Sequence, residues 1–305
     1  MKKNILESLL FYNIKNNKNL KSTIFLILIF SNLLFTQEKK ILFIGIDGCR
    51  PDALQMAKTP NIDTIIKDGL YIKNGLCSIN GQPTISGPGW STMLTGVWYD
   101  KHGVSDNSFK GGKINQYPPF NIRMKNKSNK YHIASFIMWE PIHQYIFKNS
   151  MDYNKLFFKF DESIAIEASK YMNNLELDVM FLNFDHVDHA GHWYGFSPKK
   201  NRYIKSIEKI DEYIGWVINS MKNRSTFKKE DWLIIITSDH GGIKRTHGGQ
   251  SMEEKRIPII LSGQSFNKDT VSRQAYLTDI IPTILDHFNI ESDSNWNLDG
   301  ESLLK

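Results

Sequence analysis

Acidic and histidine side chains follow three apolar runs in this chain, at the point where each run ends. They are Asp47 after ILFIGI, Asp188 and His192 after DVMFLNF, and Asp239 and His240 after WLIIITS. If each run forms a buried parallel strand, the carboxyl ends of the strands open into one crevice of an α/β sheet, and these side chains meet there. Carboxylate oxygens and imidazole nitrogens are ligands of divalent cations. The pattern therefore predicts a metal-binding hydrolytic site.

The second of these groups is dense in metal-binding side chains. Residues 185–192 read DHVDHAGH, and five of these eight side chains can bind a metal ion. The spacing from Asp188 to His192 puts both side chains on one face of a helical turn, where they can reach the same ion. Structural histidines rarely crowd in this way, so we interpret the segment as a ligand group.

Asp239 and His240 can share an ion only if the chain turns between them, because adjacent residues of a strand face opposite sides of the sheet. Gly241 and Gly242 follow directly and permit such a turn. His247 lies in a second glycine-flanked loop, THGG. A single histidine is more often a satisfied polar residue than a ligand, so the interpretation depends on the acids and histidines together.

A hydrolytic site also needs a nucleophile, and Ser86 is the candidate. Residues 83–96, PTISGPGWSTMLTG, predict a turn and then a helix that starts near Pro88 or Gly89, with Ser86 at or just before its amino end. The helix dipole and free N–H groups there favour an alkoxide and a bound anion, and a metal ion lowers the hydroxyl pKa further. The alternative for Ser86 is an ordinary N-cap role. The rival nucleophiles are Thr84 and Ser91.

The order of these motifs resembles that of the alkaline phosphatase superfamily. GIDGCRPD, TPNID, PTISGPGWSTMLTG, DKHGV, DHVDHAGH, SDHGG and HGG follow one another, and the similarity covers nearly all of residues 40–305. The set most resembles the type I phosphodiesterase/nucleotide pyrophosphatase branch. This resemblance implies a site for two divalent metal ions, commonly Zn²⁺, and a covalent phospho-enzyme intermediate. Asp and His ligands also accept Mn²⁺ and, less well, Mg²⁺.

The resemblance also implies a role for each matching residue. Asp47, Asp239 and His240 would hold the metal ion that activates Ser86, whose oxygen counts as a further ligand. Asp188, His192 and His247 would hold the metal ion that polarises the substrate. Asp185, His186 and His189 would support these ligands or be structural. Two neighbouring cations can stabilise both the entering and the leaving oxygen of an in-line displacement.

The resemblance favours phosphodiesters or nucleotide pyrophosphates as substrates. A phosphomonoesterase, a phosphotransferase or a sulfatase-like hydrolase is the alternative on the same scaffold. Residues 86–90, SGPGW, lack the arginine of the sulfatase C/S-x-P-x-R motif, which argues against formylglycine chemistry. The alternative of another class is a catalytically inactive protein that binds metal or anions. The intact hydroxyl and complete ligand set argue against that alternative.

Gly87, next to the nucleophile, and Trp193 are the candidate substrate contacts. Trp193 and Tyr194 follow the DHVDHAGH motif directly and could line a pocket for a base or a lipid. Aromatic residues beside a sheet edge are more often part of the core. Arg50, near the first ligand, is expected to pair with Asp52 or to pack structurally.

Composition indicates a globular protein rather than a nucleic-acid-binding one. The chain has 305 residues, with 41% hydrophobic and 23% charged residues, and a formal net charge of +6. Residues 1–38 hold five Lys and two Glu, which leaves +3 for the remainder. No dense basic block with interleaved aromatic residues remains, so we expect no specific nucleic-acid partner. The partner is a small phosphate ester, and the oligomeric state is left open.

Residues 1–37 are predicted to be a signal peptide or an N-terminal anchor. The twelve residues from Ile24 to Phe35 are too few to span a bilayer, which takes about 20, but they fit a signal-peptide core. We therefore expect an exported protein that is periplasmic, secreted or surface-anchored and touches a membrane only through such an anchor. Two cysteines, Cys49 and Cys77, exclude a disulfide framework and are either one pair or two buried thiols.

Alternating strand and helix patterns predict one α/β catalytic domain over residues 38–305, a three-layer α/β/α sandwich with a mostly parallel sheet. The expected strands are 40–46, 70–76, 131–138, 177–184, 232–237 and 257–262. The expected helices include 60–68, 199–223 and 276–288. Residues 106–130 are rich in Lys, Asn and Gly, and we interpret them as a small cap or surface insertion beside the site.

Overall fold

The computed structural model describes residues 37–148, 150–264, 266 and 271–304. Residues 39–305 form one compact unit. The expected signal peptide or anchor lies outside the described residues, apart from residue 37. In the part of the chain that is described, no helix is both long enough and apolar enough to cross a membrane.

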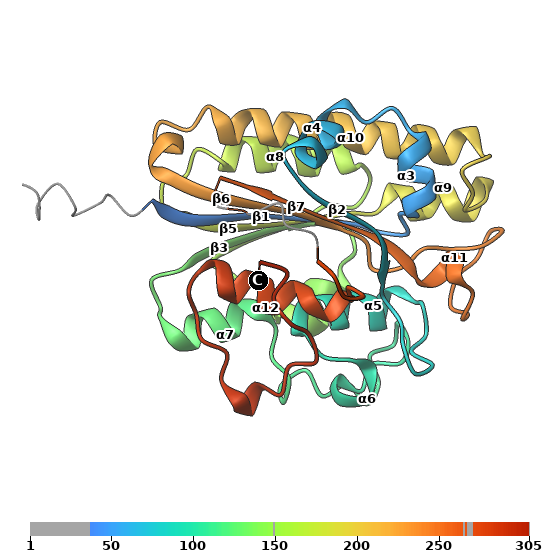
Figure 1. Cartoon of the computed structure of the whole chain (residues 1–305), viewed down its shortest axis with the longest axis horizontal. Coiled ribbons are helices and arrows are strands. Elements are labelled where there is room, and N and C mark those ends of the chain that lie inside the picture. The colour runs from blue at the N-terminus through green and yellow to red at the C-terminus, as the bar shows by residue number, and fades with distance from the viewer. Residues whose placement is uncertain (1–36, 149, 265, 267–270, 305) are drawn as a thin grey trace, which may run out of the picture. The chain divides into compact units, whose positions relative to one another are not determined.

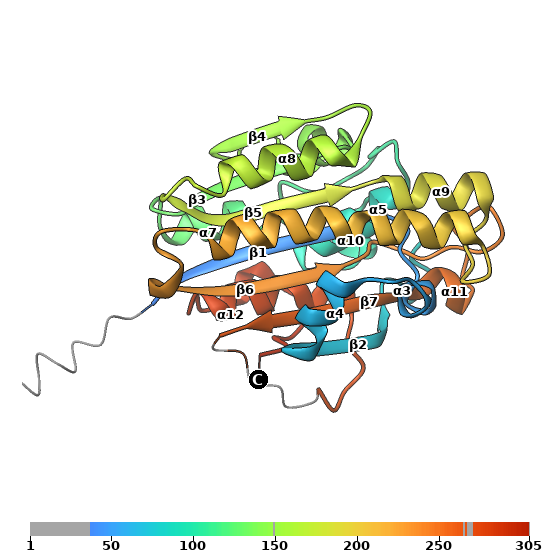
Figure 2. The same ribbon diagram turned by 90° about the horizontal axis from the view of Figure 1, so that it is seen from above.

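A single seven-stranded sheet runs through the domain (Figures 1 and 2). The strands are β1 (Glu38–Ile46), β2 (Gly69–Leu76), β3 (His132–Ile137), β4 (Tyr153–Leu156), β5 (Leu177–Phe184), β6 (Glu230–Thr237) and β7 (Arg256–Gly263). Their order is β2-β7-β6-β1-β5-β3-β4. β1, β5, β3 and β4 pair in parallel, whereas β7 is antiparallel to both β2 and β6. The mostly parallel sheet and all six predicted strands are confirmed.

The seventh strand, β4, was not predicted from the sequence. Its four residues, YNKL, are half-buried or exposed and lie at the edge of the sheet, paired only with β3. A short edge strand buries little apolar surface and so lacks the continuous apolar run that marks the central strands.

Helices cover both faces of the sheet (Figure 1). One layer consists of α3 (Pro51–Met56), α4 (Pro60–Lys67), α8 (Asp161–Tyr171), α9 (His186–Tyr194) and α10 (Asn201–Lys222). The other contains α5 (Ser86–Thr95), α6 (Tyr99–His102), α7 (Phe120–Lys127) and α12 (Ile280–His287). Short elements are α11 (Met252–Lys255), a π-helix η1 (Ile142–Phe147) and 3₁₀-helices η2 (Phe227–Lys229), η3 (Leu277–Asp279) and η4 (Ser294–Trp296). The predicted three-layer sandwich is confirmed.

Each face of the sheet has its own hydrophobic core. Side chains alternate between the faces along β1, so that Phe43 packs in the core beneath α5 and Leu42 in the core beneath α10. Because both faces are covered, the central strands read as continuous apolar runs. The expected helix 199–223 is α10, and its apolar stripe from Ile204 to Val217 is buried in the core that contains Leu42. The predicted last helix is η3 followed by α12.

Residues 106–130, interpreted as a cap or insertion, contribute to the core as well as to the surface. Phe109, Ile114, Phe120 and Met124 are buried in the core that includes α5 and α12. The segment also contains α7. Its first residues lie beside the amino end of α5, where the nucleophile candidate is placed.

Candidate active site

The predicted metal ligands meet at the carboxyl ends of three strands. Asp47 follows β1, α9 follows β5, and Asp239 follows β6 with one residue between. The side chains form two groups, one of Asp47, Asp239 and His240 and the other of Asp188, His192 and His247. Within each group, the ligand atoms lie within 4.8 Å of one another. These are the two triplets that the motif order implied.

The first group is completely buried. The Nε2 atom of His240 lies 3.4 Å from Asp47 Oδ1 and 3.3 Å from Asp239 Oδ2. Neither of these carboxylate oxygens has a hydrogen-bond partner among the described residues. The opposite oxygens are held by protein donors, because Trp90 Nε1 donates to Asp47 Oδ2 at 3.0 Å and Gly48 N to Asp239 Oδ1 at 3.2 Å. Buried unpartnered carboxylate oxygens fit a bound cation.

The second group is closer to the surface. His192 Nε2 lies 3.2 Å from Asp188 Oδ2 and 3.1 Å from His247 Nε2, and His247 Nε2 lies 3.6 Å from Asp188 Oδ1. Gly48 brings the two groups together. Its φ of +64° suits glycine, and an added Cβ would lie 2.7 Å from Asp188 Oδ1.

All three histidines are oriented by backbone carbonyls. The Nδ1 atoms of His192, His240 and His247 lie 3.0, 2.7 and 2.9 Å from the carbonyl oxygens of Arg245, Gly241 and Thr84. A carbonyl oxygen only accepts a hydrogen bond, so each Nδ1 carries a proton. In a neutral ring the Nε2 lone pair then faces the carboxylates, which is how metal-binding histidines are usually held.

The charges of the site are unbalanced without a cation. Burial raises the pKa of the Asp47 carboxyl well above its usual range, and the neighbouring Asp239 adds to the effect. Burial also raises the pKa of Asp239 and lowers that of His240 to about 3. Burial opposes ionisation of Asp188, but the hydrogen bond from His192 and the nearby histidines outweigh it and lower its pKa. The hydrogen bond with Asp188 raises the pKa of His192 to about 8, whereas burial lowers the pKa of His247 as it does that of His240. Three crowded carboxyl groups and the neutral imidazoles of His240 and His247 form a donor set that divalent cations satisfy.

Ser86 is the first residue of α5 and lies beside the first group. Its Oγ is 3.2 Å from His240 Nε2, and the residue is 6% exposed. Gly89 permits this approach, because a Cβ at that position would lie 2.6 Å from Asp239 O. The two rivals are placed differently. Thr84 Oγ1 donates to Gly249 O, and Ser91 is fully buried.

Asn107 is a site residue that the sequence interpretation missed. Its Oδ1 accepts a hydrogen bond of 2.7 Å from the backbone N–H of Gly87, the residue after Ser86. The side chain is exposed. The only sequence signal was its place in the polar DNS triplet that follows DKHGV, which does not indicate a contact across 20 residues.

The aromatic residues near the motifs divide into core and surface. Trp90 is fully buried, packs edge-on against Phe181 and orients Asp47, and Trp98 is also buried. Trp193 is 72% exposed. Tyr194 is 38% exposed and carries the Arg202 guanidinium 4.7 Å above its ring.

The remaining predicted residues have structural partners. Arg50 forms two hydrogen bonds with Asp52, at 2.9 and 2.7 Å, as expected. His186 pairs with Asp161 and His189 with Asp185, so neither histidine joins a ligand group. Cys49 and Cys77 are both free and buried, which agrees with the alternative of two separate thiols.

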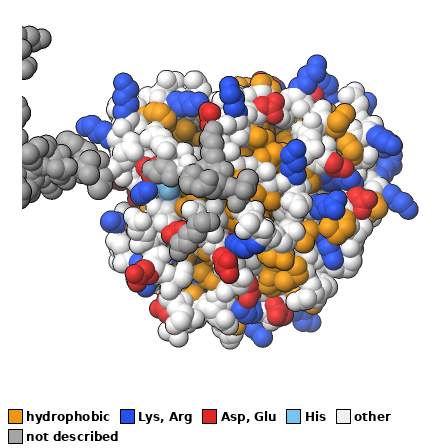
Figure 3. All heavy atoms as spheres, in the orientation of Figure 1, with side chains coloured by type: hydrophobic (Ala, Val, Ile, Leu, Met, Phe, Trp, Pro, Cys, Tyr) orange, Lys and Arg blue, Asp and Glu red, His pale blue; other side chains and the backbone are white. Residues whose placement is uncertain are grey.

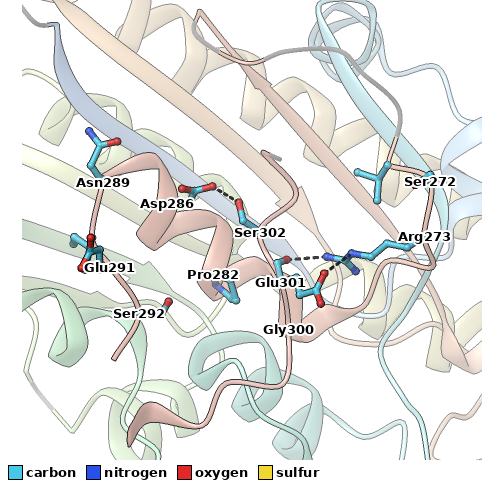
Figure 4. Close-up of a pocket in the computed structure, with 12 residues that line it drawn as sticks. Ser272, Arg273, Pro282, Asp286, Asn289, Glu291, Ser292, Gly300, Glu301 and Ser302 are labelled. Carbon is cyan, nitrogen blue, oxygen red and sulfur yellow. Dashed lines mark hydrogen bonds and ion pairs between the residues drawn. The ribbon is translucent and has the colours of Figure 1, made fainter. Parts of the chain in front are cut away.

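A cavity of about 970 Å³ lies apart from these ligands, between α12 and the carboxyl-terminal segment (Figure 4). Three of its charged side chains contact neighbours in the same cavity, since Arg273 contacts Glu301 and Asp286 accepts a hydrogen bond from Ser302. None of the predicted site residues lines it.

The fold is shared with several phosphate- and sulfate-ester enzymes. The structure of murine ectonucleotide pyrophosphatase/phosphodiesterase 5 in complex with AMP matches with a TM-score of 0.67 and 15% identity, over 84% of this chain and 96% of that one. A 2-O GAG sulfatase matches with a TM-score of 0.68 and 13% identity, over 88% of this chain and 73% of that one. At these identities the likeness shows an alkaline phosphatase-like fold.

The family itself follows from the sequence profile of the type I phosphodiesterase/nucleotide pyrophosphatase family, which matches residues 41–249. The chain belongs to this family. Human bis(5'-adenosyl)-triphosphatase ENPP4 is 28% identical over 221 residues, which are 66% of this chain and 47% of the human protein. The chain thus spans about half the length of this relative.

Proposed function

We propose that this protein is an exported, metal-dependent hydrolase that cleaves phosphodiesters or nucleotide pyrophosphates through a phosphorylated Ser86. Its family supports the class of reaction, a phosphodiesterase-type hydrolysis. The observation that carries the proposal is the position of the Ser86 hydroxyl, 3.2 Å from His240, which belongs to the first of two groups of Asp and His side chains that could hold metal ions. The substrate is a small phosphate ester.

The residues fit a site for two divalent cations. Asp47, Asp239 and His240 would hold one ion beside the Ser86 oxygen. Asp188, His192 and His247 would hold the other. Bound cations would supply the positive charge that favours the alkoxide and the phosphoryl oxygens. We propose Zn²⁺ for both, because carboxylate and imidazole donors suit it, with Mn²⁺ or Mg²⁺ as the alternatives.

The chain's own groups would then carry out a double displacement. Ser86 Oγ attacks phosphorus, and the bond to the leaving oxygen breaks, so that the leaving group departs with the electron pair and becomes protonated. Water next attacks the phosphorus of the resulting serine phosphodiester, and the bond between phosphorus and Ser86 Oγ breaks. The remaining ester group leaves as the phosphate monoester, and a proton from the water restores the Ser86 hydroxyl. Asn107, fixed through its Oδ1 by the Gly87 N–H, would donate from its amide nitrogen to a phosphoryl oxygen. A contact of Trp193 with the substrate stays a prediction.

The alternatives differ in what they require. A phosphomonoesterase, a phosphotransferase or a sulfatase-like enzyme would use the same ligands, but the SGPGW frame lacks the arginine of formylglycine sulfatases. An inactive metal- or anion-binding protein would need no hydroxyl beside the ligands. Export is supported by the apolar stretch from Ile24 to Phe35 and by the likeness to a protein named an ectonucleotide pyrophosphatase.

The test compares three esters on the whole chain loaded with Zn²⁺ or Mn²⁺. Turnover of bis-p-nitrophenyl phosphate is expected to exceed that of p-nitrophenyl phosphate and p-nitrophenyl sulfate. Ser86→Ala is expected to lower kcat by at least about 10³-fold with the metal content unchanged. Ser91→Ala is the matched control, because it removes a hydroxyl from the same helix that has no hydrogen-bond partner among the described residues.

Each outcome of this test favours one of the proposed functions. Preference for p-nitrophenyl phosphate would favour a phosphomonoesterase, and preference for p-nitrophenyl sulfate would favour a sulfatase-like enzyme. Full activity in Ser86→Ala would exclude Ser86 as the nucleophile. Metal binding without turnover of any ester would favour the inactive binding protein.

A further inference from the structure

A cluster of cationic side chains beside the second ligand group has no acidic partner among the described residues. We call it the basic rim, and it consists of Lys199, Lys200, Arg202, Lys244 and Arg245, all exposed. None of the five forms an ion pair with another described residue. Farther along α10 the same residue type is neutralised, because Lys205 and Lys209 contact Glu208 and Glu212 at 2.6 and 2.8 Å. Like charges left unpaired repel one another, and an anionic partner outside the domain would relieve this repulsion.

The rim is a single patch because its two segments pack together. The backbone N–H of Phe196 donates to Lys244 O at 2.7 Å, and His192 Nδ1 contacts Arg245 O at 3.0 Å. No Asp or Glu occurs in residues 193–207 or 243–252. Lys and Arg side chains are visible along the edge of the molecule where Figure 1 places α9 and α11 (Figure 3). The patch therefore presents concentrated positive charge next to the His192 ligand.

An exposed indole adjoins the rim. Trp193 is 72% exposed, whereas Trp90, Trp98 and Trp232 are at most 8% exposed. Its neighbour Tyr194 receives a hydrogen bond of 2.9 Å from Arg202. Tryptophan and tyrosine flanked by basic residues are characteristic of surfaces that meet lipid head groups, where the ring has an apolar side and a polar side. A soluble polyphosphate or polysulfate chain would engage the cations but would give the indole no apolar surroundings.

We propose that this face docks the protein on an anionic lipid membrane, which departs from the expectation that only an N-terminal anchor would touch one. The basic rim lies at the negatively charged head groups, and Trp193 enters the interface between head groups and acyl chains. The half-exposed His192 then faces the membrane surface. Docking is a property of the surface and does not depend on turnover, so the proposal stands apart from the proposed hydrolysis.

The test measures binding of the whole chain to vesicles of phosphatidylcholine and phosphatidylglycerol (7:3) and to vesicles of phosphatidylcholine alone. The rim variant is Lys199→Gln/Lys200→Gln/Lys244→Gln. The control is Lys205→Gln/Lys209→Gln/Lys222→Gln, which loses the same net charge from exposed positions of α10. Both carry the same N-terminal segment, so any membrane affinity of residues 1–37 is common to them.

We expect the rim variant to bind the anionic vesicles about 100-fold more weakly and the control to stay within about threefold of wild type. This factor corresponds to about 1 kcal/mol for each Lys near an anionic membrane. Vesicles should shift tryptophan emission to the blue in wild type and in Ser86→Ala, and much less in Trp193→Ala.

Three results would overturn the proposal. Equal losses in the rim and control variants would mean that only net charge matters. An unchanged emission shift in Trp193→Ala would mean that the indole does not enter the lipid. Short single-stranded DNA that binds wild type and Trp193→Ala equally, and displaces the vesicles, would make the rim a site for soluble polyanions instead.

Discussion

Replacement of Gly89 by alanine tests whether close packing of α5 against the β6 end positions the nucleophile. The added Cβ would lie 2.6 Å from Asp239 O, and ordinary contact begins at about 3.4 Å, so one side must move by about 0.8 Å. Both sides matter, because α5 carries Ser86 and Asp239 is a ligand candidate. A misplacement of about 1 Å costs on the order of 10²-fold in rate, so we expect kcat to fall by about 30- to 100-fold. Alanine otherwise favours a helix over glycine by about 1 kcal/mol, so a loss of activity would be steric.

The assay is kcat and KM for bis-p-nitrophenyl phosphate with metal content and thermal unfolding measured on the same samples. Gly215→Ala is the matched control, because its Cβ would also approach to 2.6 Å, but against the Asn61 side chain on α4. We expect this variant to change stability and leave kcat within about twofold. Gly89→Ala with wild-type kcat and full metal content would refute the argument that this contact positions the site.

Three further predictions concern metal binding and stability. Trp90→Phe removes the N–H that orients Asp47 and should weaken metal affinity by about 10- to 100-fold, measured by competition with a chelator. The control is Trp232→Phe, which removes an indole N–H bonded to Glu230 and should leave metal affinity unchanged. Removal of metal by a chelator should lower Tm reversibly, since an ion at about 100 times its Kd adds about 2.7 kcal/mol per site, and an unchanged Tm would exclude tight binding. Burial lowers the pKa of His102 to about 3 in the folded protein, whereas in the unfolded chain the pKa of this histidine is about 6.5. Between these two pH values the unfolded chain binds a proton at His102 and the folded protein does not. The free energy of unfolding should therefore fall as the pH decreases from 6.5 to 3, and urea unfolding of His102→Gln should show a shallower slope than wild type; equal slopes would contradict the assignment.

The fold was largely predictable because its central strands are buried on both faces. Their apolar runs, such as ILFIGI before Asp47, cannot belong to a half-exposed element, and the stripe of α10 indicates one buried helical face. The edge strand β4 escaped prediction because edge position removes the apolar signal. The antiparallel direction of β7 also needed the structure, since a buried strand of either direction has the same composition.

The candidate ligands could be predicted for a topological reason. The residues that surround and orient them could not be predicted. Residues that follow parallel strands must share one end of the sheet, so Asp47, Asp188 and Asp239 were expected together. The partners that orient them come from remote parts of the chain. Trp90 reaches Asp47 across 43 residues, and Thr84 O holds His247 across 163. Such contacts leave no local pattern in the sequence.

The sequence by itself therefore determined most of the element types, the family resemblance and which acid and histidine residues are candidate ligands, because periodicity and residue chemistry are local properties. Only the tertiary structure decided that Asn107 joins the Ser86 turn and that Trp90 is internal while Trp193 faces solvent. It also left the basic rim without acidic partners among the described residues. These features arise from packing between distant segments, and the energy of a packed contact depends on distances that residue order does not specify.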